Sequence, residues 1–152
     1  MKELVKKLVS EFGDKEYAHA YMEEFSNMAI AAQIKALREQ RNWTQQQLAQ
    51  ASQMKQERVS ALEDVDYDAW TIKTLRKLAR AFDLTLKVSF EKFSSSITEM
   101  PKIDRQSLQR PSREQDLMEF SRNEYGHGET TWASPVKTGQ ANVRVVPLRK
   151  VA

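Results

Sequence analysis

Apolar residues recur at spacings of three and four over most of the first 83 positions, which is the period of an amphipathic α-helix. The pattern predicts helices over residues 2–12, 15–41, 45–52, 56–63 and 72–82. The second of these is either one long helix or two helices with a kink near Asn27. After Asp83 the period changes to two, which predicts a half-buried strand over residues 84–90. Its apolar face carries Leu84, Leu86, Val88 and Phe90.

The character of the chain changes at Ser94, where a polar stretch begins. We expect residues 94–152 to be a largely flexible tail, with a short helix over 112–125 that opens on a capping box formed by Ser112 and Gln115. Residues 142–148 could form a short strand. The predicted organisation is an N-terminal helical extension over 1–29, a helical domain with a terminal strand over 30–93, and the tail over 94–152.

Composition narrows the range of functions. The chain contains no cysteine and no apolar run long enough to cross a bilayer, so we expect a soluble cytoplasmic protein without membrane contact. The two histidines, His19 and His127, belong to no catalytic or metal-binding spacing, so we expect no enzyme, metal or cofactor. The net charge of +3 is uneven, because residues 1–29 carry −2 and residues 30–63 carry +2. The second stretch is therefore the better candidate for binding phosphates.

The informative unit is residues 34–63, which read as a helix, a short capped helix, a three-residue turn and a second short helix. Thr44 and Gln47 have the spacing of a capping box at the start of the first short helix. Apolar positions let three helices share a small core, which leaves the outer face of 56–63 uncovered. That face displays Gln56, Glu57, Ser60 and Ala61, with Arg58 on its flank. A narrow polar face of this kind fits a DNA major groove about 12 Å wide.

Simpler explanations exist for the same residues. Three helices around a shared core also occur in proteins that never bind DNA, where Gln56 is a solvated surface residue. Arg58 is as easily explained by a salt bridge with Glu57 as by a DNA contact. Trp43 and Trp70 are better explained as lids on the core than as groups that stack on bases.

The run QIKALREQRNWTQQQLA at residues 33–49, followed by VSALE at 59–63, resembles the Cro/phage-repressor (XRE) helix-turn-helix family. The similarity extends to roughly half of the chain and is greatest to members that end this domain in a strand. It implies a mostly α fold, a λ-repressor-like helix-turn-helix bundle with a helical extension before it, and a function in DNA binding.

The resemblance also implies roles for individual residues. Gln45 matches a position that holds a DNA phosphate with its side chain and backbone N–H, and Gln56 matches one that reads adenine. Glu63 matches a structural acid that ends the recognition helix. Two positions depart from the family pattern, because Gln53 stands where glycine is usual and Lys55 stands where a Ser or Thr cap is usual. The expected DNA-binding residues are Thr44, Gln45, Lys55, Gln56, Glu57, Arg58, Ser60 and Ala61.

The predicted strand has unpaired edges, and the simplest partner for an edge is the same strand of a second copy. We therefore expect a homodimer that places two recognition helices about 34 Å apart on a near-palindromic operator in double-stranded DNA. Residues 142–148 could instead pair with this edge. The function that follows is a sequence-specific transcriptional regulator, most simply a repressor. The alternative is an antitoxin that represses its own promoter and binds a protein partner through the tail, around residues 117–125.

Overall fold

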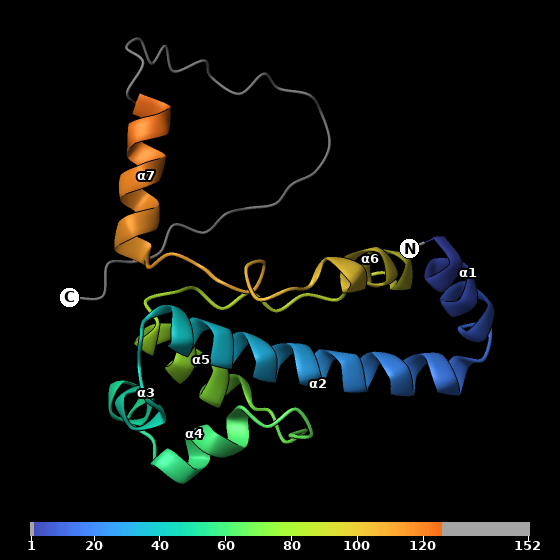
Figure 1. The fold of residues 1–152 in the computed structure, drawn as a ribbon, viewed down its shortest axis with the longest axis horizontal. Helices are drawn as coiled ribbons and strands as arrows, with labels where there is room; N and C mark the ends of the chain where they lie inside the picture. The colour runs from blue at the N-terminus through green and yellow to red at the C-terminus, as the bar shows by residue number, and fades with distance from the viewer. Residues whose placement is uncertain (1, 126–152) are drawn as a thin grey trace, which may run out of the picture.

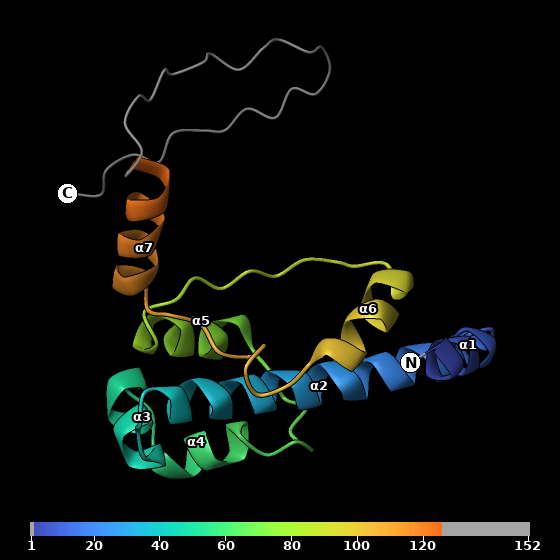
Figure 2. The same cartoon turned by 45° about the horizontal axis from the view of Figure 1, so that its top comes forward.

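The structure, a computed structural model that describes residues 2–125, is organised along one long helix (Figure 1). The smaller helices gather at the two ends of this helix, and the last one stands away from the body in both views (Figures 1 and 2). The elements in chain order are α1 (Lys2–Glu11), α2 (Lys15–Gln40), α3 (Gln45–Ser52), α4 (Gln56–Leu62), α5 (Ile72–Ala81), α6 (Phe93–Glu99), the 3-10 turn η1 (Met100–Lys102) and α7 (Arg113–Tyr125). None of the helices within residues 2–125 combines the length and the hydrophobicity needed to cross a bilayer.

The long helix α2 is continuous over 26 residues, so the kink near Asn27 that the sequence left open does not form. Asp14 starts the helix by accepting a hydrogen bond from the Tyr17 N–H at 2.8 Å. Asn42 ends it in a left-handed conformation with φ 55°. At 1.5 Å per residue α2 is about 39 Å long, and the expected domain boundary at residues 29 and 30 lies inside it.

The main core lies where α3, α4 and α5 pack around the C-terminal half of α2. Phe82 is almost fully buried in it and stacks on Trp43 with ring centroids 5.9 Å apart. Trp43 and Trp70 pack against the core from its edge, as the sequence predicts. The buried members are Ile34, Leu37, Leu48, Ala49, Val59, Leu62, Leu78 and Phe82.

A second, smaller core lies at the other end of α2, and the sequence did not predict it. Residues from 94 onward were expected to be flexible, but Phe93–Glu99 forms α6 beside α1 and α2. Ile97 of α6 is buried, and Phe93 meets Phe12 edge to face with centroids 5.9 Å apart. Phe93 and Ile97 are four residues apart and therefore lie on one side of α6. The helix is specified by these two contacts, because the serines between them carry no periodic signal.

The prediction of a strand over residues 84–90 is wrong for the single chain. No strand is present within the described residues, and 84–92 runs as an unpaired connection from α5 to α6 (Figure 2). Leu84 and Leu86 are half-buried, whereas Val88 and Phe90 are exposed. The alternation predicted two different faces, but a ladder also requires a neighbouring backbone, and none of the described segments supplies one. The possible strand over 142–148 lies outside the described residues.

The connection from η1 to α7 returns along α2. Arg105 forms an ion pair with Glu39 at 2.9 Å, the Arg110 N–H donates to Gln40 Oε1 at 3.0 Å, and Gln33 Nε2 donates to the Leu108 carbonyl at 3.3 Å. These contacts order a stretch that was expected to be flexible.

The predicted helix over residues 112–125 is present as α7. Its capping box is formed, because Ser112 and Gln115 each accept a hydrogen bond from the backbone N–H of the other. Arg113 anchors the first turn, through its N–H to the Asp83 carbonyl at 2.8 Å and through its guanidinium to the Asp83 carboxylate at 3.0 Å. Beyond this anchor the side chains of Leu117, Met118 and Phe120 are exposed.

The left-handed turn after α3 leads to a test of stability. Gln53 has φ 54° and ψ 46°, a conformation that costs most residues about 1 kcal/mol and costs glycine little. We expect Gln53→Gly to raise the free energy of unfolding by up to about 1 kcal/mol in urea denaturation, whereas Gln50→Gly inside α3 lowers it by about the same amount. Equal losses from both variants would contradict the proposed strain at Gln53.

Candidate nucleic-acid interface

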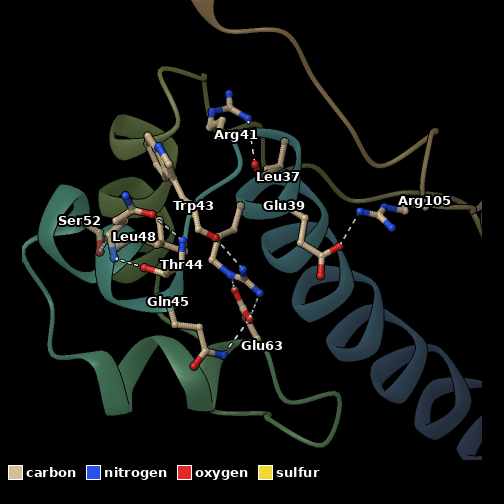
Figure 3. A network of polar contacts seen from close by, with 12 residues as sticks. Leu37, Glu39, Arg41, Trp43, Thr44, Gln45, Leu48, Ser52, Glu63 and Arg105 are labelled. Atoms are coloured by element: carbon tan, nitrogen blue, oxygen red, sulfur yellow. Dashed lines mark hydrogen bonds and ion pairs between the residues drawn. The ribbon is translucent and has the colours of Figure 1, made fainter.

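The start of α3 is held by the predicted capping box (Figure 3). Thr44 Oγ1 accepts a hydrogen bond from the Gln47 N–H at 3.1 Å, and Gln47 Oε1 accepts one from the Thr44 N–H at 2.8 Å. Both interactions use local donors, so the first turn of α3 does not depend on the rest of the fold. The capping box fixes the position of Gln45, the first residue of α3.

The turn between α3 and α4 brings the two helices close together. Gln53 adopts the left-handed conformation that its position requires, and the Met54 N–H donates to the Ala49 carbonyl at 2.9 Å. Ala49 is buried, and its small side chain permits the close approach. Ser52 is also buried, and its hydroxyl donates to the Leu48 carbonyl at 2.6 Å. The end of α3 is therefore satisfied internally although the usual glycine is missing.

The helix α4 has one buried side and one exposed side. Val59 and Leu62 are fully buried in the core. The other side forms a polar ridge made of Gln56, Glu57 and Ser60, which are exposed, together with Arg58 and Ala61, which are half-buried. Lys55 precedes the helix with an extended backbone and makes no side-chain cap, as the sequence predicts. The ridge therefore lies on the surface of residues 2–125 with its polar groups accessible.

A buried ion pair ties the end of α4 to α2 and α3. The guanidinium of Arg38 holds the Glu63 carboxylate with two hydrogen bonds, Nε to Oε1 at 2.5 Å and Nη2 to Oε2 at 2.9 Å. Their side chains are only 13% and 5% exposed. Gln45 Nε2 donates to the same carboxylate at 3.0 Å (Figure 3). The hydrogen bonds that Arg38 donates to the Glu63 carboxylate raise the pKa of Arg38 above its ordinary value, although burial opposes this shift.

This network changes the interpretation of Gln45. The resemblance implied that its side chain binds a phosphate, but in this structure the side-chain amide is held by Glu63, which uses one of its two N–H donors and fixes its direction. The sequence identified Glu63 as a structural acid and missed its partner. A signal for Arg38 existed, because it lies four residues after Ile34 on the apolar side of α2, where an unpaired charge is costly.

Arg58 lies beside an aromatic ring instead of a carboxylate. Its guanidinium carbon is 5.2 Å from the centroid of the Tyr67 ring, within the range of a cation–π contact. Tyr67 in turn meets Trp70 edge to face at 4.7 Å, and its hydroxyl donates to the Ala69 carbonyl at 2.7 Å. The salt bridge between Arg58 and Glu57 that the sequence left open is absent from the ion pairs of the described residues. Arg58 is therefore held at the side of the ridge with its charge unneutralised.

A helix-turn-helix family model matches residues 34–88, the stretch that contains α3, the turn and α4 with its polar ridge. The matched model is that of the XRE-type helix-turn-helix family, and the match covers less than half of the chain. This is a family of DNA-binding transcription regulators that are generally not enzymes. Neither the curated proteins nor the solved structures contain a significant match to the chain. In the matched region α4 occupies the place of the second helix of the motif, and the likeness to members that end in a strand is not confirmed.

The ion pair between Arg38 and Glu63 leads to a second test of stability. Removing one partner of a buried pair leaves the other charge without compensation, which typically costs 3–5 kcal/mol. We expect Glu63→Ala to lower the free energy of unfolding by about 3 kcal/mol in urea denaturation. Glu3→Ala, which removes an exposed pair with Lys6, serves as the control and should change it by less than about 1 kcal/mol. Similar effects of the two substitutions would contradict a structural role for the buried pair.

Proposed function

We propose that this protein is a sequence-specific DNA-binding transcription regulator, and that it acts as a repressor in the cytoplasm. The observation that carries the proposal is the polar ridge of α4, because its buried side is anchored in the core while Gln56, Glu57 and Ser60 are accessible. A helix fits the DNA major groove with such a ridge facing the bases. A regulator bound in this way over a promoter blocks access of the polymerase.

Each residue of the interface then has a defined task. Gln56, in the first turn of α4, reads adenine with its side-chain amide, which presents one donor and one acceptor in the right geometry. Glu57, Ser60 and Ala61 face neighbouring base edges, and Arg58 contacts the DNA at the side of the ridge. Lys55 and Thr44 lie near the phosphates. Because the amide of Gln45 is bound to Glu63, we assign its phosphate contact to its backbone N–H at the start of α3.

A homodimer is part of this proposal. The segment 84–90 leaves the helix-turn-helix domain with the backbone of residues 85–90 free of backbone hydrogen bonds to other described residues and with its apolar residues Val88 and Phe90 exposed. Contact between two copies through Leu84, Leu86, Val88 and Phe90 removes this surface from water. It also relates two recognition helices by a two-fold axis, so that they meet successive major grooves about 34 Å apart on a near-palindromic operator.

Replacement of Gln56 tests the assignment of the reading face. Selection from random DNA with the purified protein gives the operator. We expect Gln56→Ala to weaken binding to it by about 1–3 kcal/mol and to relax preference at one base pair in each half-site. Gln106→Ala, at an exposed glutamine outside the helix-turn-helix domain, is the matched control and should bind as the unchanged protein does. A uniform loss of affinity for all sequences would contradict base reading by Gln56.

One observation favours a second function, that of an antitoxin. The helix α7 stands away from the body, held mainly at Arg113, and exposes Leu117, Met118 and Phe120. Isolated helices of this length are marginal in water, and the exposed apolar side chains suit a protein partner. In this function α7 neutralises a toxin, while the helix-turn-helix domain represses the promoter of both genes.

Substitution in α7 separates the two functions. The double variant Leu117→Asp with Phe120→Asp alters only exposed positions, so we expect unchanged operator affinity and unchanged helical content by circular dichroism. If the protein is an antitoxin, cells that express the variant in place of the natural protein lose viability. Normal growth, together with intact operator binding, supports the regulator without a toxin.

A further inference from the structure

The connection 84–92 combines exposed apolar side chains with an unsatisfied backbone. No backbone N–H or carbonyl of residues 85–91 takes part in a backbone hydrogen bond with another described residue. The side chain of Val88 is 67% exposed, and that of Phe90 is as exposed as in an extended chain. An extended segment of this kind is a template for pairing with another strand.

The two sides of the segment differ in chemistry. Leu84, Leu86, Val88 and Phe90 alternate with polar residues. The stretch 84–89 as a whole lines a groove of about 840 Å³ together with core residues of α2 and α5. On the polar side, Ser89 Oγ donates to Glu91 Oε1 at 2.8 Å, which places these two residues on the same side. Lys87 belongs to that side by its spacing, and its ammonium has no carboxylate partner among the ion pairs of the described residues.

From this arrangement we infer that the partner of the segment is the same segment of a second copy, paired antiparallel with the two-fold axis at Ser89. In this register Lys87 of each copy lies opposite Glu91 of the other, and Val88 lies opposite Phe90. Both the charges and the exposed apolar side chains are therefore matched twice, and every second residue of the paired stretch gains backbone hydrogen bonds to the other copy. The inference rests on the homodimer proposed above and specifies the surface that forms it.

Neighbouring registers match the segment less well. An axis at Lys87 sets two lysines directly opposite each other, which is unfavourable. An axis at Val88 leaves Lys87 opposite Ser89 and Glu91 opposite Thr85, so neither charge is paired. A register in which the axis lies between two residues would set apolar side chains opposite polar ones. The axis at Ser89 pairs both charges and both exposed apolar residues, and its one apolar-to-polar pair within 86–92 is the half-buried Leu86 opposite Lys92.

Cysteine cross-linking tests the register, because the natural chain contains no cysteine and a single introduced one is unambiguous. A residue on a two-fold axis meets its own counterpart, so Ser89→Cys in the full-length protein should give a disulfide-linked dimer on mild oxidation. Thr85→Cys lies on the same side but opposite Phe93 of the other copy, and it should remain largely monomeric on a non-reducing gel.

Sedimentation of both variants under reducing conditions separates the possible failures. A dimer in which Thr85→Cys or Lys87→Cys cross-links in preference to Ser89→Cys overturns the register and leaves the homodimer standing. A protein that sediments as a monomer at tens of micromolar overturns both. Operator half-site binding by such a monomer leaves the DNA-reading role of α4 untouched.

A charge exchange tests the pairing of Lys87 with Glu91. Lys87→Glu or Glu91→Lys alone replaces two attractive contacts by two repulsive ones, and we expect the dimer dissociation constant to rise about tenfold. The double variant restores opposite charges and should return to within about threefold of the unchanged protein. Lys102→Glu, an exposed lysine on η1, is the control and should have no effect. A double variant that dimerises as weakly as the single ones overturns the inference.

Discussion

The buried pair of Arg38 and Glu63 is the interaction on which the geometry of the interface depends. Two ionised groups taken out of water are tolerated only when their hydrogen-bonding capacity is used, and here the carboxylate accepts from Arg38 and from Gln45. The three side chains come from α2, α3 and the end of α4. A shift of any one of these helices therefore breaks a hydrogen bond to the buried carboxylate, and that loss is costly. This explains how the domain keeps its shape with Gln53 and Lys55 where a glycine and a capping hydroxyl are usual.

The long helix α2 connects the main core at its C-terminal end with the smaller core at its other end. It is unbroken from Lys15 to Gln40, and the chain from η1 to α7 is bound along it through contacts of Arg105, Arg110 and Leu108. The small core around Ile97 therefore has a fixed position relative to the recognition helix. A boundary between extension and domain drawn from composition alone misses this, since a change in net charge does not interrupt a helix.

The sequence predicted those elements whose signals are local. Capping residues and apolar periods mark α1, α3, α4, α5 and α7, and the left-handed turn at Gln53 was implied by the family resemblance, in which glycine is usual at this position. The elements that depend on distant partners were missed or wrong. The helix α6 is stabilised because Phe93 and Ile97 pack at the end of the molecule formed by α1 and the start of α2. Arg38, the partner of Glu63, lies 25 residues away in the sequence. In the segment 84–90 apolar and polar residues alternate as they do in a strand. This alternation predicts two different faces, but it does not show that another strand lies beside the segment to pair with it.

The contacts that hold α4 in place leave its exposed face free. A helix of seven residues without a side-chain cap has little stability of its own. It is held by Val59 and Leu62 on its buried side and by Glu63 at its end, and none of these contacts involves Gln56, Glu57 or Ser60. The polar ridge therefore contributes little to folding. On the proposed function, the buried side of this short helix supplies its stability and the exposed side reads the bases.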